Sequence, residues 1–152
     1  MDDVYYMTQA LAEACKAFEL DEVPIGCIIV YEGKVISKAK NERVTRKNVL
    51  GHAEILAIDA ACKYLGDWRL DNTRLYVTVE PCPMCAGAIV QARIPVVVFG
   101  AKSPKAGSAG SIINILNEPG FNHQVQVTQG VLEEESSRLL QKFFKKFRGK
   151  FE

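Results

Sequence analysis

The chain lacks the features of a membrane or secreted protein. No apolar run approaches the roughly 18 residues that a membrane-spanning helix needs. The N-terminus, Met1-Asp2-Asp3, is acidic, whereas a secretory signal starts with basic residues and continues with apolar ones. The five cysteines are an odd number, which does not suit a fully paired disulfide framework. We therefore expect a cytoplasmic protein with no membrane contact, whose reduced cysteines bind metal, catalyse or fill space.

The chain also has little net charge, because 19 lysines and arginines nearly balance 18 acidic residues to give +1. The charge is unevenly distributed. Residues 138–150 contain six cations and no acid, so the remainder of the chain carries a formal charge of −5. An acidic body with one basic end can direct an anionic partner to one place.

The spacing of apolar residues divides the chain into helices and strands. A spacing of three or four residues predicts helices over residues 2–19, 52–65 and 132–148, and one more that ends at about residue 93. Runs rich in β-branched residues predict strands over residues 25–32, 35–41, 74–80, 96–100 and 124–128. The polar segment 42–51 and the Gly/Ser-rich segment 101–111 are expected to be loops.

The order of these elements predicts the fold class. The first two strands are joined at Gly33-Lys34 and form a hairpin, whereas the strand–helix–strand unit after residue 74 predicts a parallel, right-handed crossover. We expect one three-layer α/β/α domain over residues 1–152, with a mixed five-stranded sheet and helices on both faces. A basic helix at about 132–148 ends this domain.

His52, Cys82 and Cys85 are the candidate metal ligands. The two cysteines form a Cys-x-x-Cys pair one helical turn apart, and Pro83 suits the first position of that helix. From His52 the helix runs away for roughly 21 Å, and the following strand returns by about 23 Å, so the cysteines come back to the level of the histidine. Two thiolates and one imidazole with an open fourth position form a catalytic zinc site, whereas structural zinc sites have four protein ligands.

Glu54 is the candidate proton carrier beside this site. It lies two residues after His52, and residues at i and i+2 of a helix do not share a face. We therefore infer that His52 lies at the very start of its helix or just before it. A helix that is continuous from residue 48 to 56 would contradict this inference.

The remaining cysteines and the second histidine fit the metal site poorly. Cys62 is ten residues from His52, about 15 Å along the helix axis. Cys15 and Cys27 fall on apolar faces and are expected to be small core residues. His123 lies in a predicted loop with no cysteine near it in the sequence.

His-x-Glu followed by Pro-Cys-x-x-Cys is the signature of zinc-dependent nucleobase deaminases. From about residue 4 to 148, the chain resembles the bacterial tRNA adenosine deaminases of the cytidine-deaminase-like superfamily. Besides this signature, the resemblance is carried by residues 22–26, Asn41, residues 75–85, 100–102, 105–111, 121–123 and 130–148.

The resemblance implies the roles of individual residues. One Zn²⁺ per subunit would be held by His52, Cys82 and Cys85, with Glu54 as the proton shuttle. It implies deamination of adenosine to inosine at the wobble position of a tRNA anticodon stem-loop, by a cytoplasmic homodimer whose RNA site draws on both subunits. The implied substrate contacts are Asn41, Ala53, Lys102, Ser103, Phe144 and Arg148.

Two positions depart from the family pattern. Leu50-Gly51 replaces Thr-Ala before the metal histidine, which is expected to alter the mouth of the pocket only. Ser103 stands where an aspartate is common, which is expected to change one RNA contact.

Two other functions are compatible with the same residues. A free nucleobase or nucleoside deaminase, for example of guanine or cytosine, would use the same zinc site. A zinc-stabilised RNA-binding module without catalysis would need neither Glu54 nor an open metal position. The basic final helix favours RNA, although its cations also complement the helix dipole. Most of its phenylalanine stripe is expected to be core, with one ring left for stacking.

Overall fold

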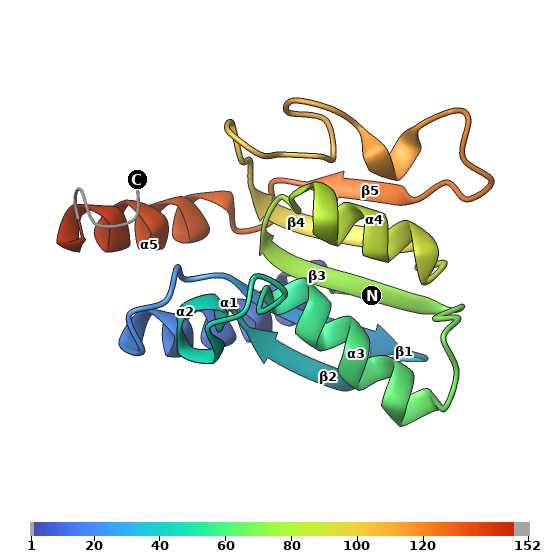
Figure 1. Cartoon of the computed structure of the whole chain (residues 1–152), viewed down its shortest axis with the longest axis horizontal. Helices are drawn as coiled ribbons and strands as arrows, with labels where there is room; N and C mark the ends of the chain where they lie inside the picture. The colour runs from blue at the N-terminus through green and yellow to red at the C-terminus, as the bar shows by residue number, and fades with distance from the viewer. Residues whose placement is uncertain (1, 148–152) are drawn as a thin grey trace.

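The computed structural model describes residues 2–147 and contains one five-stranded sheet (Figure 1). The strand order is β2-β1-β3-β4-β5, in which β1 is antiparallel to both of its neighbours and β3, β4 and β5 are parallel. The mixed five-stranded sheet is therefore confirmed. The strands are β1 (Gly26–Tyr31), β2 (Lys34–Lys40), β3 (Thr73–Val79), β4 (Val96–Ala101) and β5 (Gln126–Gln129).

Helices cover both faces of the sheet, as predicted (Figure 1). α1 and α5 pack on one face, whereas α3 and α4 pack on the other. The helices are α1 (Asp3–Glu19), the single turn α2 (Arg43–Arg46), α3 (Ala53–Leu65), α4 (Pro83–Gln91) and α5 (Glu133–Lys146), with a short 3₁₀ turn at Ile115–Asn117. Within residues 2–147, no helix is both long and apolar enough to cross a membrane.

The central strands are apolar at nearly every position because both of their faces are covered. In β1, Cys27 and Ile29 point into the core beneath α3 and α4, whereas Ile28 and Val30 pack against α1. The expectation that Cys27 is a core residue is therefore confirmed.

α1 begins at an N-cap formed by Asp2, whose carboxylate accepts hydrogen bonds from the backbone N–H groups of the first turn. The helix lies so close to β1 that a Cβ on Gly26 would come within 1.9 Å of the carbonyl oxygen of Ala10. The prediction for Cys15 is wrong, because this side chain is exposed. The buried face of α1 includes Ala14, and the next residue is turned by about 100° around the helix axis.

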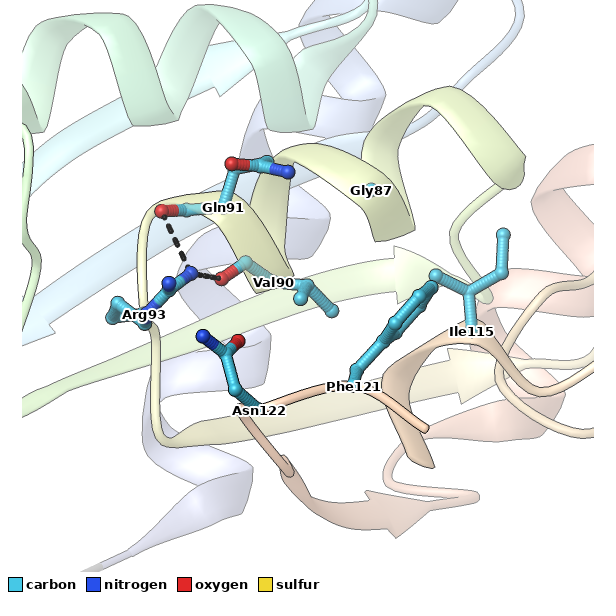
Figure 2. Close-up of a pocket in the computed structure, with 7 residues that line it drawn as sticks. All are labelled: Gly87, Val90, Gln91, Arg93, Ile115, Phe121 and Asn122. Atoms are coloured by element: carbon cyan, nitrogen blue, oxygen red, sulfur yellow. Dashed lines mark hydrogen bonds between the residues drawn. The ribbon is translucent and has the colours of Figure 1, made fainter. Parts of the chain in front are cut away.

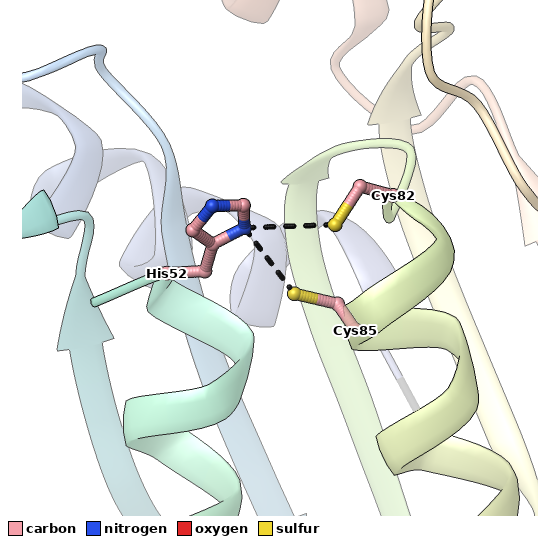
Figure 3. Close-up of side chains that lie close together, drawn as sticks. All are labelled: His52, Cys82 and Cys85. Atoms are coloured by element: carbon pink, nitrogen blue, oxygen red, sulfur yellow. Dashed lines mark hydrogen bonds between the residues drawn. The ribbon is translucent and has the colours of Figure 1, made fainter. Parts of the chain in front are cut away.

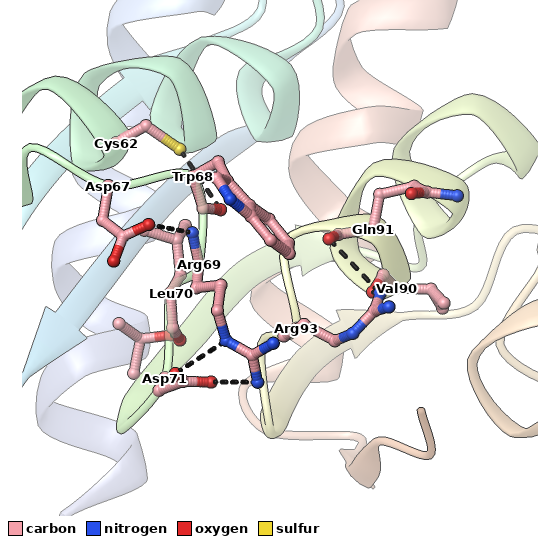
Figure 4. Close-up of polar contacts among 10 residues, drawn as sticks. Cys62, Asp67, Trp68, Arg69, Leu70, Asp71, Val90, Gln91 and Arg93 are labelled. Carbon is pink, nitrogen blue, oxygen red and sulfur yellow. Dashed lines mark hydrogen bonds and ion pairs between the residues drawn. The ribbon is translucent and has the colours of Figure 1, made fainter. Parts of the chain in front are cut away.

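The C-terminal ends of α3 and α4 are tied together by the connection that leads into β3. Gly66 ends α3 in the left-handed conformation, and the N–H of Leu70 donates to the carbonyl of Ala92 at 2.7 Å. Figure 4 shows this region, in which Arg69 pairs with Asp71 and lies 5.5 Å from the ring of Trp68. Because this end of the two helices is fixed, their N-terminal ends are held side by side at the opposite end.

Three segments differ from the sequence prediction. The loop at 42–51 contains the turn α2, which buries no side chain and so leaves no apolar period in the sequence. β5 starts two residues late, because the N–H of Val125 donates to Leu116 and pairing with β4 begins only at Gln126. The final helix ends at Lys146 with Phe147 as its C-cap, about two residues before the predicted end near residue 148, which itself lies outside the described residues.

Candidate active site

The N-terminal ends of α3 and α4 bring three metal-ligating side chains together (Figure 3). His52 is the N-cap of α3 and has an extended backbone, with φ −83° and ψ 144°. It therefore precedes the helix, as inferred from its spacing to Glu54. Cys82 is the N-cap of α4, Pro83 is at the start of that helix, and Cys85 follows within the first turn.

The geometry of this group fits a zinc ion. The Nδ1 atom of His52 lies 3.6 Å from the Sγ of Cys82 and 3.5 Å from the Sγ of Cys85. A tetrahedral zinc with Zn–S near 2.3 Å and Zn–N near 2.05 Å would separate such ligands by about 3.6 Å. Within residues 2–147, this is the one group of three or more potential ligands that could hold a metal.

The ionisation of these groups is coupled. A hydrogen bond from Cys85 lowers the pKa of Cys82 to about 4, and the same contact, with burial, raises the pKa of Cys85. The hydrogen bond with Cys82 also raises the pKa of His52. A divalent cation between the two sulfurs would favour the thiolate form of both.

Glu54 lies on the first turn of α3 and is only 4% exposed. Burial raises the pKa of this carboxyl to about 7, and the negative charge of Cys82 adds to the rise. Because its pKa is near neutrality, Glu54 can both accept and release a proton at physiological pH. A carboxyl of this kind beside an open metal position fits general acid–base catalysis.

A cavity of about 180 Å³ opens onto His52, Glu54 and Cys82. Asn41 lines it and is held by a hydrogen bond from its Nδ2 to the carbonyl of Val23. The Oδ1 atom of Asn41 is buried and has no hydrogen-bond partner within the described chain. A buried oxygen without a partner is costly, so this atom is suited to accept a hydrogen bond from a ligand.

The chain is similar to known deaminases in sequence and in structure. The chain matches the MafB19-like deaminase family over residues 1–148. A tRNA-specific adenosine deaminase of Bacillus subtilis is 53% identical over 148 residues, which are 97% of this chain and 92% of that protein. A solved structure from a study of A-to-I editing by tRNA:A34 deaminases is 43% identical, with a TM-score of 0.86 over 90% of this chain and 99% of the other.

The chain belongs to the tRNA-specific adenosine deaminase family. It is therefore a hydrolytic deaminase with a cytidine-deaminase-like fold. A guanine deaminase of Bacillus subtilis is a more distant structural neighbour, 31% identical with a TM-score of 0.66 over 100% of this chain and 99% of the other.

The implied substrate contacts of this deaminase fall in two adjoining cavities. Asn41, Ala53 and Ser103 line the cavity at the metal ligands. Lys102, Ser103 and Phe144 line a second cavity of about 510 Å³, which shares Ser103 with the first. Arg148 lies outside the described residues.

Sequence reasoning missed two buried carboxylates that organise loops, and one of them, Glu80, lines the metal-site cavity. Glu22 is 1% exposed and accepts hydrogen bonds from the N–H groups of Val44 and Thr45, which hold the turn α2. Glu80 is 4% exposed and accepts hydrogen bonds from residues of the 103–111 loop. Burial alone would raise the pKa of Glu80, but these hydrogen bonds lower it below its usual value. The sequence signal that could have identified Glu80 is a carboxylate placed directly after an apolar strand.

The Phe-Asn-His motif lies away from the metal ligands. Phe121 and Asn122 line a separate pocket of about 410 Å³ against the outer side of α4, with Arg93 (Figure 2). His123 makes a 2.8 Å hydrogen bond to the carbonyl of Ile94, which is a structural role. As expected, neither His123 nor Cys62 belongs to the metal-binding group.

Proposed function

We propose that this deaminase converts adenosine to inosine at the wobble position of a tRNA anticodon. The observation that carries the proposal is a Cys₂His group with an open fourth position beside a buried carboxylate that is not one of its three ligands. The relative named tRNA-specific adenosine deaminase, at 53% identity, supports adenosine in tRNA as the substrate.

His52, Cys82 and Cys85 would hold one Zn²⁺ per subunit, in the geometry described above. When bound, zinc acidifies a water molecule and so supplies the nucleophile at neutral pH. The carboxylate of Glu54 accepts the proton of that water and delivers it to the purine ring nitrogen N1, which makes C6 electrophilic. Glu54 would then take the remaining proton from the water oxygen that has bonded to C6 and pass it to the amine, so that the C6–N bond breaks and ammonia leaves. The reaction consumes one water and releases one ammonia for each inosine formed.

The size of the metal-site cavity implies that the target base is unstacked from its neighbours before it binds. The metal-site cavity is small, about 180 Å³, so a base stacked within a helix cannot enter it, whereas a nucleotide of an anticodon loop can be turned out. We assign Asn41 and Ala53 to the target nucleotide, because both line this cavity. Lys102, Ser103 and Phe144 would contact flanking nucleotides in the adjoining cavity.

The end of α5 supplies an aromatic ring and cations for RNA. Phe143 is fully buried, whereas Phe144 is 44% exposed and is the ring available for stacking. Lys145 and Lys146 follow it, and Lys146 lies 3.4 Å from Asp21 in an exposed ion pair that is worth little. We assign both lysines, together with Arg148, to salt-dependent phosphate contacts.

The experiment compares substrates on the zinc-loaded protein. A stem-loop with A34 should yield inosine, whereas a C34 stem-loop and free adenosine or guanine should react far more slowly. Glu54→Ala is the matched control, since it leaves the three ligands in place. Equal rates on free nucleosides or guanine would favour the alternative of a free-base deaminase, which the guanine deaminase neighbour keeps relevant. Absence of inosine from every RNA would favour a non-catalytic RNA-binding module.

We further propose a cytoplasmic homodimer, as the family resemblance implies. The five free cysteines of the structure are compatible with a reducing compartment. Light scattering of the zinc-loaded protein tests the dimer, and a monomer at working concentration would contradict it.

A further inference from the structure

Glu80 is a buried carboxylate for which the proposed reaction has no chemical use. It follows β3 directly and precedes Pro81 and Cys82. It is 4% exposed, and no lysine, arginine or histidine of residues 2–147 forms an ion pair with it. Burying an unpaired charge is costly, so its hydrogen bonds must compensate.

All of its hydrogen-bond donors come from one loop, residues 103–111. The backbone N–H groups of Ser103, Ala109 and Ser111 each donate to the carboxylate at 3.0 Å, and the hydroxyl of Ser111 donates as well. The loop folds closely around the charge. A Cβ on Gly107 would lie 2.5 Å from the carboxyl carbon of Glu80, so that position accommodates only glycine.

The same loop forms one wall of the substrate cavities. Ser103 and Ala106 line the cavity at the metal ligands, and Ser103, Pro104 and Lys105 line the adjoining cavity. Within the loop, the N–H of Gly107 donates to the carbonyl of Ser103 at 2.8 Å. The position of this wall therefore depends on hydrogen bonds that converge on two oxygen atoms.

We propose that Glu80 is a positioning residue, whose fixed negative charge holds the 103–111 loop as the wall against which the RNA substrate binds. The inference rests on the proposed function. Glu80 acts through the loop and not on the reacting atoms, so its effect belongs to substrate binding. A glutamine at this position keeps the shape but replaces one acceptor oxygen by an NH₂ group, which faces the donors of the loop.

The test compares Glu80→Gln with Glu13→Gln in the zinc-loaded protein. Glu13 is a buried carboxylate on α1 that pairs with Lys16 and accepts no hydrogen bond from this loop. For Glu80→Gln we expect normal zinc content, a kcat within about twofold of wild type and a KM for the A34 stem-loop raised about tenfold. Glu13→Gln should leave KM and kcat unchanged.

Hydrogen exchange provides a readout that does not depend on activity. The amides of Ala109 and Ser111 should exchange faster in Glu80→Gln than in wild type, because the carboxylate is their acceptor. If wild type forms no inosine, the proposed function fails, but the exchange of this loop still tests whether Glu80 holds it.

Ser111→Ala is a milder variant in case Glu80→Gln does not fold, since Ser111 is exposed and loses only its hydroxyl donor. It should raise KM by a smaller factor, and the double variant should be no worse than Glu80→Gln alone. The proposal is overturned if kcat falls while KM is unchanged, if zinc is lost, or if the exchange of the loop does not change.

Discussion

Replacing Glu54 by glutamine should change how the stability of the metal-free protein depends on pH. Burial raises the pKa of Glu54 from the usual 4.5 to about 7, so the folded state holds its proton more tightly than the unfolded chain does. The stability that this group contributes is therefore present in full below about pH 4.5 and is lost as the pH rises through about 7. A shift of this size corresponds to about 3 kcal/mol when the full range is covered.

Glutamine cannot ionise, so it should remove this loss. We expect the free energy of unfolding of wild type, relative to Glu54→Gln, to fall by about 2 to 3 kcal/mol between about pH 5 and pH 8. Urea unfolding in the presence of a chelator, followed by circular dichroism at both pH values, measures the difference. Parallel pH profiles for the two proteins would refute the argument that burial governs this carboxyl.

Three further predictions concern the metal, the RNA and the core. Cys82→Ser and Cys85→Ser should each lose zinc, and full occupancy by metal analysis would remove that residue from the ligand set. Lys145→Glu with Lys146→Glu should weaken stem-loop binding and reduce the salt dependence of log K by about 1.4, for two single-strand phosphate contacts; an unchanged slope would show that these cations do not contact RNA. Gly26→Ala should lower the free energy of unfolding by about 1 to 3 kcal/mol or more, because its Cβ would collide with the backbone of α1. Chemical denaturation measures this loss, and an unchanged free energy of unfolding would contradict the close packing of α1 on β1.

The elements that position the metal ligands were predictable from the sequence because local signals agree there. The start of α3 follows from the spacing of His52 and Glu54, and the start of α4 follows from Pro83. Their proximity follows from the length of one helix and the strand that returns. The resemblance to known deaminases added the identity of the substrate, which the spacing alone does not contain.

The parts that were not predictable depend on contacts between distant segments. The turn α2 has no apolar side chain to bury and is held by Glu22, which lies about twenty residues earlier. Cys15 is exposed because it lies just beyond the edge of the buried face of α1, which includes Ala14. Hydrophobic periodicity reports burial against a core, so it cannot report a loop that is organised around a carboxylate.

Glu54 and Glu80 show that low exposure alone does not determine what a carboxyl in this site can do. Both are 4% exposed and both line the cavity at the metal ligands, yet the pKa of Glu54 is raised and that of Glu80 is lowered. For Glu54, burial outweighs the interactions that favour the anion, so its proton is exchangeable near neutral pH. Glu80 lies beneath one loop whose donors stabilise the anion, so it remains charged and cannot carry protons. The donors around each carboxyl therefore distinguish a group suited to proton transfer from a group suited to hold a loop.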